Sequence, residues 1–453
     1  MYKKTSWVLV TLFIVLSMIL AACQPAAEET PTEPPAATDE PAMTEAPAEG
    51  EQIGGSVNVL VVWGDAELEN FQAMLAPFEE RTGVTVEIES TRDLNAVLTS
   101  RVEGGNPPDV AGLPGPGQLL TFAESGDLQP LNEALDMDTM TSQYDEGILQ
   151  LASVNDQLYG IFIKISPKSF VWYNPQAFDA AGYAIPETWE QLNDLEAQII
   201  ADGTTPWCIG LESGAASGWP GTDWIEDIML RTAGPDVYDQ WVNHEIEWTS
   251  DAVTNAWETW GTVVNDPEMV FGGPQNVLTT NFGESPFPMF EDPPVCYLHR
   301  QADFITGFIT EQFPDLVAGE DYNFFPFPPI DESQGNPLLI AGDLFGMFND
   351  TPQAQALMQW LVTPEAQAIW AERGGFISAN TEVDPSVYPD TLTQQIGQMV
   401  PEAAAVRFDA SDLMPSAVNS AFWSGILDFV GNPDQLPDIL QSIEDTAVDA
   451  YGQ

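Results

Sequence analysis

Basic residues are scarce in this sequence of 453 residues. It holds 11 Lys and Arg against 70 Asp and Glu, which gives a formal net charge of -59. A polyanion of this size repels phosphate backbones, so nucleic acid is excluded as a partner. Lys3 and Lys4 belong to the first 22 residues, and the basic residues that remain are too few and too scattered to form a binding stripe.

Cysteine and histidine are also rare, with 3 and 2 residues. This set offers too few ligands for a zinc site, and His244-Glu245 lacks a second His four positions after the first. We therefore expect no metal and no cofactor. Apart from Cys23, the remaining pair of Cys208 and Cys296 is a disulfide candidate in an oxidising compartment, and two independent buried thiols are the alternative.

The N-terminus has the pattern of an export signal. Lys3 and Lys4 precede an uncharged apolar run over residues 5–22, which ends in Leu-Ala-Ala before Cys23. This pattern resembles a bacterial lipoprotein signal. The resemblance implies that residues 1–22 are a signal peptide and that lipid on Cys23 anchors the protein to the cell membrane, outside the cytoplasm. An uncleaved membrane anchor is the alternative.

Residues 23–53 are rich in Pro and acidic residues and contain no aromatic residue. Such a segment cannot bury enough surface to offset its ordering entropy, so we expect a flexible tether. The rest of the chain contrasts with it, because 23 Phe, 14 Trp and 10 Tyr provide ample surface for packed cores.

The folded part opens with an alternating pattern. Residues 56–63 form a β-rich apolar run, residues 67–81 place apolar side chains on one helical face, and residues 84–88 alternate as a second strand. A strand, helix and strand in this order predict a parallel sheet. Ligands bind at the carboxyl ends of such strands, where Trp63 and Asp65 lie.

A second α/β segment spans residues 170–300. Residues 170–174 and 208–211 are predicted strands, and residues 186–201 and 223–232 are predicted helices. Thr188 is the expected N-cap of the helix that follows it. Further helices are predicted over residues 351–373 and 437–451.

Several short motifs follow one another along the chain: NPPDV at 106–110, WYN at 172–174, PETW at 186–189 and GGFIS at 374–378. In this order they resemble extracellular solute-binding proteins of ABC sugar importers. A second set resembles the α-glucoside-binding branch of that family. It comprises PWCIGLES at 206–213, GWP at 218–220, HRQ at 299–301, AGD at 341–343 and RFDASDLMP at 407–415.

The resemblance implies an α/β fold of the two-lobed, type II periplasmic-binding-protein kind. The ligand would lie in the cleft between the lobes, and the chain would cross the hinge several times. By analogy, one lobe comprises residues 54–163 plus 301–349, and the other comprises residues 164–300 plus 350–453. The implied partners are a carbohydrate, here an α-glucoside or another oligosaccharide, and the transmembrane subunits of an ABC permease. The protein would be a monomer and not an enzyme.

Sugar chemistry supplies a separate basis for candidate site residues. A pyranose offers apolar C–H faces for aromatic rings and a rim of hydroxyls for carboxylates, amides and Arg. The candidate platforms are Trp63, Trp172, Trp219 and Trp224. The candidate polar partners are Asp65, Lys164, Glu212, Ser213, Asp223, Arg300, Gln301, Gly342, Asp343, Arg407 and Asp412.

Two other classes of protein fit the same composition. A secreted glycoside hydrolase needs two suitably spaced carboxylates, and 70 acidic residues always supply some pair. A structural surface lipoprotein would use its aromatic residues as core and bind no small ligand. Sugar binding without turnover separates the first class from a receptor, and ligand-dependent stabilisation separates the second.

Overall fold

The computed structural model describes residues 52–452, without the side chains of residues 401 and 402. The predicted signal peptide, the lipidation site Cys23 and the predicted tether up to residue 51 lie outside the described residues. The first strand begins four residues into the described part.

The larger sheet has seven strands in the order β12-β6-β11-β3-β1-β2, and β13 pairs with β11. As predicted, β1 runs parallel to β2, and it also runs parallel to β3, while β11 is antiparallel to both β3 and β6. The strands are β1 Ser56–Val61, β2 Thr85–Ser90, β3 Val110–Leu113, β6 Gly160–Pro167, β11 Leu338–Met347, β12 Ile377–Ser378 and β13 Val406–Phe408.

The first helix shows why this part of the sequence folds as predicted. α1 spans Asp65–Thr82 and buries Phe71, Leu75 and Phe78, whose spacing places them on one face. It ends at Gly83, which has a φ of 66°. Glycine adopts this left-handed conformation without strain, so the chain can turn sharply into β2.

The smaller sheet has four strands in the order β10-β7-β9-β8. These strands are β7 Phe170–Tyr173, β8 Thr205–Trp207, β9 Cys296–Arg300 and β10 Asn323–Pro326, and β4 Ser153–Val154 pairs separately with β5 Gln157–Leu158. The strand predicted over residues 208–211 is wrong. The strand in this part of the chain is β8, which ends at Trp207 and pairs with β9.

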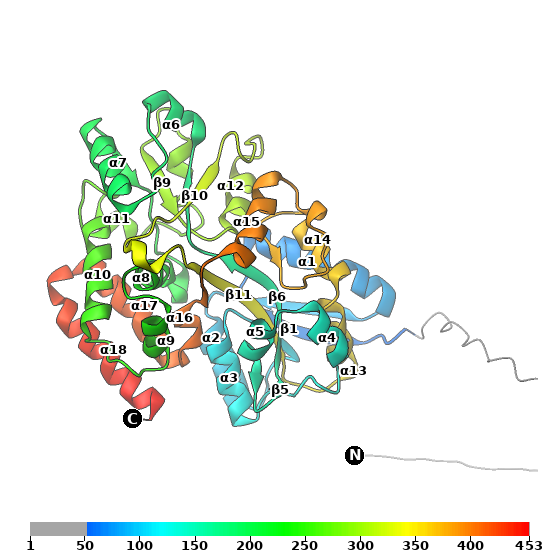
Figure 1. Cartoon of the computed structure of the whole chain (residues 1–453). Helices are drawn as coiled ribbons and strands as arrows, with labels where there is room; N and C mark the ends of the chain where they lie inside the picture. Colours follow the sequence, from blue (N-terminus) through cyan, green and yellow to red (C-terminus); the bar gives the residue numbers. More distant parts are fainter. Residues whose placement is uncertain (1–51, 453) are drawn as a thin grey trace, which may run out of the picture. The chain divides into compact units, whose positions relative to one another are not determined.

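Two hydrophobic cores accompany the two sheets. The first contains Val59, Phe71 and Phe345, and the second contains Trp207 and Phe422. We call the parts built around them the first and second lobes. The chain passes between the lobes after β6, after β10 and after β13, which agrees with the expected fold. In Figure 1 the red helix α18 lies with α17 on the side of the molecule that holds the green helices α8 and α10.

The assignment of residues 350–453 to the second lobe needs a correction. Helices α13 and α14 pack against α1 of the first lobe. Trp360 Nε1 donates a hydrogen bond to the carbonyl oxygen of Met74 at 3.0 Å, and Arg81 forms an ion pair with Glu365. Within residues 350–453, the buried side chains of the second core begin at Ala410.

The helix predicted over residues 351–373 is in fact two helices, α13 and α14. Thr363 begins the second, because its side chain accepts a hydrogen bond from Ala366 N. The predicted cap at Thr188 is confirmed, since its hydroxyl accepts from Gln191 N. Within residues 52–452, no helix combines the length and apolarity that crossing a membrane requires.

The remaining helices, in chain order, are α2 Leu94–Glu103, α3 Pro116–Ser125, α4 Met137–Gln143, α5 Glu146–Leu151, α6 Pro175–Ala181, α7 Trp189–Ala201, α8 Trp219–Thr232, α9 Pro235–Val242, α10 Asp251–Val264, α11 Pro274–Val277, α12 Ile305–Gln312, α13 Pro352–Leu361, α14 Pro364–Ala371, α15 Thr391–Glu402, α16 Ala410–Leu413, α17 Ser416–Gly431 and α18 Leu436–Tyr451. Short 3-10 turns occur at Gly214–Ala216, Phe287–Phe290, Glu332–Gln334, Pro385–Val387 and Pro433–Gln435.

Candidate functional site

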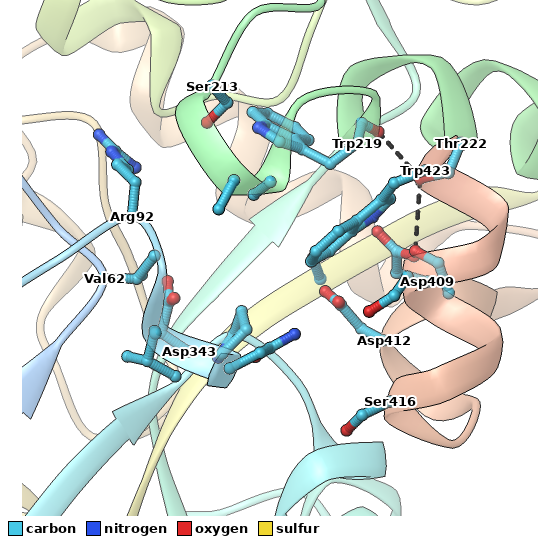
Figure 2. Close-up of a pocket in the computed structure, with 18 of the residues that line it drawn as sticks. Val62, Arg92, Ser213, Trp219, Thr222, Asp343, Asp409, Asp412, Ser416 and Trp423 are labelled. Carbon is cyan, nitrogen blue, oxygen red and sulfur yellow. Dashed lines mark hydrogen bonds between the residues drawn. The ribbon is translucent and has the colours of Figure 1, made fainter. Parts of the chain in front are cut away.

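A cavity of about 580 Å³ lies between the two lobes. Trp63 and Glu67 line it from the first lobe. Trp219 and Trp423 line it from α8 and α17, two helices whose buried side chains belong to the second core. Figure 2 shows Asp343, Asp409, Asp412 and Arg92 around the same space. The cavity therefore has aromatic rings, carboxylates and cations within reach of one small molecule.

The structure brings many of the predicted site residues together at this cavity. They reach it from the end of β1, from the β6 and β11 strands, and from the loops and helices of the second lobe. The predicted residues that line it are Trp63, Lys164, Ser213, Trp219, Asp223, Gly342, Asp343 and Asp412.

Lys164 is a buried cation on the first-lobe side of the cavity. It lies on β6, is 2% exposed, and donates a hydrogen bond to Glu67 Oε1 at 2.7 Å. Asp343 Oδ2 lies 3.6 Å from the same ammonium. Burial alone would lower the pKa of Lys164, but Glu67 and Asp343 outweigh burial and raise it. Lys164 is therefore charged at neutral pH.

At Asp343, burial has a larger effect on the pKa than the neighbouring charge. Burial raises the pKa of Asp343 to about 6, although Lys164 acts to lower it. Nearby Asp303 is 2% exposed, and burial raises its pKa to about 7 against the attraction of Lys164. The cavity wall at Asp343 and the interior near Lys164 at Asp303 thus hold carboxyl groups that titrate close to neutral pH.

Lys168 is a second buried cation of the cavity and lies on its second-lobe side. It lies directly after β6 and is 5% exposed. Its ammonium donates to Asp223 Oδ1 at 2.8 Å and also forms a hydrogen bond with Asp409. Burial raises the pKa of Asp412, and the neighbouring negative charge of Asp409 adds to the effect. The sequence analysis missed both Lys168 and Asp409 as site residues.

Three buried carboxylates, those of Asp223, Glu226 and Asp409, have ligand atoms within 4.8 Å of one another. A divalent cation could use this geometry, but Lys168 already supplies a cation to Asp223 and Asp409. The trio is therefore accounted for as the counter-charge of a buried lysine.

Aromatic side chains form much of the remaining wall. Trp219 makes an edge-to-face contact with Phe282, with ring centroids 5.1 Å apart. Trp63 is 2% exposed and packs against Phe71 and Trp370, so it offers little surface to the cavity. Trp423, on α17, lines the cavity as well. A ligand with apolar faces could pack on Trp219 and Trp423.

Two predicted aromatic platforms lie elsewhere. Trp172 is fully buried and donates its Nε1 hydrogen to the carbonyl oxygen of Gln301 at 2.8 Å. Trp224 is 1% exposed and packs against Trp207 and Phe327 in the second core. Both rings are part of the protein interior and do not line the cavity.

Several predicted polar partners are also occupied outside the cavity wall. Arg300 Nη2 donates to Asp227 Oδ2 at 2.9 Å, and Arg407 Nη2 donates to Asp239 Oδ2 at 2.8 Å. Gln301 Oε1 accepts from Ala302 N. Glu212 Oε2 accepts from Asn281 Nδ2 at 2.8 Å. Asp65 begins α1 with a φ of 48° and does not line the cavity.

The predicted disulfide between Cys208 and Cys296 is present, with Cα atoms 5.6 Å apart. It joins the segment after β8 to the start of β9, where the two strands run parallel. The bridge fixes the edge of the smaller sheet next to the loop that carries Ser213.

Other cavity residues gave weak signals in the sequence. Arg92 follows β2 in a segment that reads as an ordinary polar loop, and Trp423 reads as the apolar face of a helix. Glu67 could have been found, because it lies two residues after Asp65 at the same end of β1. The missed lining residues with polar or aromatic side chains include Glu67, Arg92, Asn95, Thr99, Lys168, Thr222, Asp409, Ser411, Ser416, Ser420 and Trp423.

Comparison with known proteins places this arrangement among binding proteins. The family model described as bacterial extracellular solute-binding protein matches residues 64–368. The osmoprotective compounds-binding protein GgtB of Synechocystis sp. is 44% identical over 396 residues, which cover 87% of this chain and 93% of that protein. The alpha-glucosides-binding periplasmic protein AglE of Rhizobium meliloti is 39% identical and covers 83% of this chain and 84% of its own.

Solved structures show the same fold at low identity. The bacterial solute receptor AcbH, described as preferring β-D-galactopyranose, aligns with a TM-score of 0.77 at 19% identity, over 88% of this chain and 100% of that one. A chitin oligosaccharide binding protein aligns with a TM-score of 0.77 at 20% identity, with the same coverage. These likenesses establish a two-lobed fold.

Proposed function

Because this chain belongs to the family of bacterial extracellular solute-binding proteins, we propose that it captures a neutral α-glucoside or a related oligosaccharide. It is the substrate-binding component of a sugar-type ABC transporter and works outside the cytoplasm. It is a receptor and not an enzyme. The identity of the ligand is the proposed part.

The observation that carries the proposal is the composition of the interlobe cavity. Trp219 and Trp423 offer apolar surface, while Asp343 and Asp412 offer acceptors for hydroxyl groups. A sugar presents both kinds of surface, and alternating C–H faces and hydroxyl edges match such a wall. The 39% identity to an alpha-glucosides-binding protein supports an α-glucoside in particular.

The ligand should also bring the lobes together. Trp63 and Asp343 lie in the first lobe, and Asp412 and Trp423 lie on α16 and α17 of the second, so one bound molecule would contact both. We expect closure around the ligand to create the surface that the permease recognises. We propose that a single chain performs this role, because residues of both of its lobes line the cavity.

A calorimetric screen tests the proposed ligand. Purified protein is titrated with maltose, trehalose and sucrose, and each mixture is then analysed for free glucose. Stoichiometric binding without glucose release is the expected result, together with a rise in melting temperature that corresponds to about 2.7 kcal/mol at one hundred times the dissociation constant. Binding of none of these sugars would reject the α-glucoside assignment, and release of glucose would reject a pure receptor.

Membrane attachment through Cys23 is a second part of the proposal. Its support is the Leu-Ala-Ala-Cys pattern that follows the apolar N-terminal run. In a bacterial host, the wild-type protein should partition into the detergent phase of a Triton X-114 extract. The Cys23→Ser variant should lose the lipid and keep an uncleaved signal, which mass spectrometry detects directly. Equal N-terminal masses, corrected for the substitution, would reject lipidation.

A further inference from the structure

Arg92 is exceptional among the arginines of the described chain, because its guanidinium has no oxygen partner there. Every other described arginine donates to a carboxylate or amide oxygen, as Arg101 does to Glu89 and Arg373 to Asn70. The contrast is large in a protein with 70 acidic residues and 11 basic ones. A guanidinium offers five N–H donors in a planar fork, and here none of them is used within residues 52–452.

The position of Arg92 makes these donors available to a ligand. It lies between β2 and α2 of the first lobe and lines the interlobe cavity. In Figure 2 its side chain extends from that segment toward the green loop that carries Ser213, with Trp423 and Asp412 on the other side of the cavity.

Arg92 also contacts an aromatic side chain that lines the cavity. Its guanidinium carbon lies 5.1 Å from the centroid of the Phe282 ring. Phe282 is tied to the segment that follows β8, because its backbone N–H donates to the carbonyl oxygen of Glu212. The Phe282 ring belongs to the first core and also contacts Trp219 of α8, so the guanidinium rests on the aromatic wall of the cavity in a cation–π contact that is individually weak.

The other cations of the cavity are already neutralised. Lys164 is bound by Glu67 and Asp343, and Lys168 is bound by Asp223 and Asp409. Among the described cavity residues, Arg92 is therefore the one cation that donates no hydrogen bond to a carboxylate. Glu212 lies close enough to attract it, but the Glu212 oxygens accept from Gly214 N and Asn281 Nδ2. An anionic ligand would meet these carboxylates and the net charge of -59, which together repel it.

We propose that Arg92 is a ligand-binding residue that donates hydrogen bonds to acceptor oxygens at the outer end of a neutral, polyhydroxylated ligand. This inference rests on the proposed function and specifies how that site distinguishes its ligand. Since Phe282 also contacts Trp219, a ligand held by Arg92 would lie beside the aromatic wall of the cavity. Because these hydrogen bonds exist only in the bound state, their loss should appear mainly as faster ligand release.

The test measures sugar binding by Arg92→Gln, Arg92→Lys and a control, Arg81→Gln. Arg81 forms an exposed surface pair with Glu365, so its loss should change little. Maltose and trehalose are titrated into each protein by calorimetry, dissociation is followed by stopped-flow Trp fluorescence, and the melting temperature is recorded without sugar.

We expect Arg92→Gln to weaken binding by at least about tenfold, mainly through faster dissociation, since a hydrogen bond to a charged donor contributes on this scale. Arg92→Lys should fall between wild type and Arg92→Gln, because it keeps the charge and loses the fork. The melting temperatures without sugar should agree, since no hydrogen bond within the described chain is lost.

Three outcomes would overturn the inference. Equal affinity of wild type and Arg92→Gln for a sugar that binds would remove Arg92 from the site and leave the proposed function intact. Failure of wild type to bind any sugar of the panel would reject the proposed function and this inference with it. Tighter binding of maltobionate than of maltitol, lost in Arg92→Gln, would show that Arg92 serves an anionic ligand instead.

Discussion

The buried charge of Lys164 gives the sharpest test of how the cavity is held together. The Lys164→Met variant replaces the ammonium with an apolar group of similar length. Glu67, which lies 2.7 Å from the ammonium, and Asp343, at 3.6 Å, would then face each other without a cation. Lys164 is 2% exposed, so water cannot replace it fully.

Breaking a buried ion pair by removing one partner costs about 3–5 kcal/mol. The cost should depend on pH, because burial already raises the pKa of Asp343 to about 6 while Lys164 opposes that rise. A carboxyl group with a raised folded-state pKa stabilises the protein below its unfolded pKa of 3.8, and this stabilisation is lost as the pH rises through the folded-state value. Removing Lys164 raises the folded-state pKa further. The difference from wild type should therefore be small near pH 4 and largest above pH 7.

Urea denaturation followed by Trp fluorescence, at pH 4.5 and pH 8, measures this difference. We expect the free energy of unfolding of Lys164→Met to fall by about 3–5 kcal/mol at pH 8 and by clearly less at pH 4.5. The double variant Glu67→Gln/Lys164→Met should recover part of the loss, because it removes one of the unpaired charges. A loss below about 1 kcal/mol at pH 8, with no dependence on pH, would refute the role given to this ion pair.

Three further predictions concern other parts of the structure. Asp303→Asn should raise the free energy of unfolding at pH 8 by about 2 kcal/mol and have no effect near pH 4, because burial raises the pKa of Asp303 to about 7 and its charged form is unfavourable in the folded state; an equal effect at both pH values would contradict this. Reducing the Cys208–Cys296 bridge, which closes a separation of 88 residues, should lower that free energy by about 4–5 kcal/mol, and an unchanged urea midpoint in dithiothreitol would argue against it. Trp423→Ala should weaken binding of whichever panel sugar binds by about tenfold in calorimetry, whereas Trp172→Phe should leave affinity unchanged because Trp172 lies outside the cavity wall.

The local elements were predictable where sequence periodicity and packing agree. The β1, α1 and β2 segments alternate or repeat in the way their buried faces require, and Thr188 has the side chain that an N-cap needs. The disulfide was a candidate because the sequence holds two cysteines besides Cys23 and its N-terminus resembles an export signal. None of these inferences required knowledge of distant contacts.

Which residues line the cavity was harder to predict. The type of a residue does not reveal which side chains, distant in sequence, the fold places beside it. Arg300 is a plausible sugar ligand by chemistry, but Asp227, 73 residues away, already binds its guanidinium. Trp224 is equally plausible, yet Trp207 and Phe327 enclose it. Arg92 is the opposite case, a cavity residue that the sequence did not indicate. Nothing in its local sequence shows that its guanidinium forms no hydrogen bond to an oxygen of the described residues.

The placement of the two lysines has a practical consequence for labelling experiments. Lys164 and Lys168 are the lysines of the described chain, and both are buried at the cavity wall. Residues 52–452 therefore present almost no accessible primary amine while the protein is folded. Reagents that acylate amines should modify this region only when the wall opens, so the rate of acylation at these two positions, read by peptide mass spectrometry, reports directly on opening.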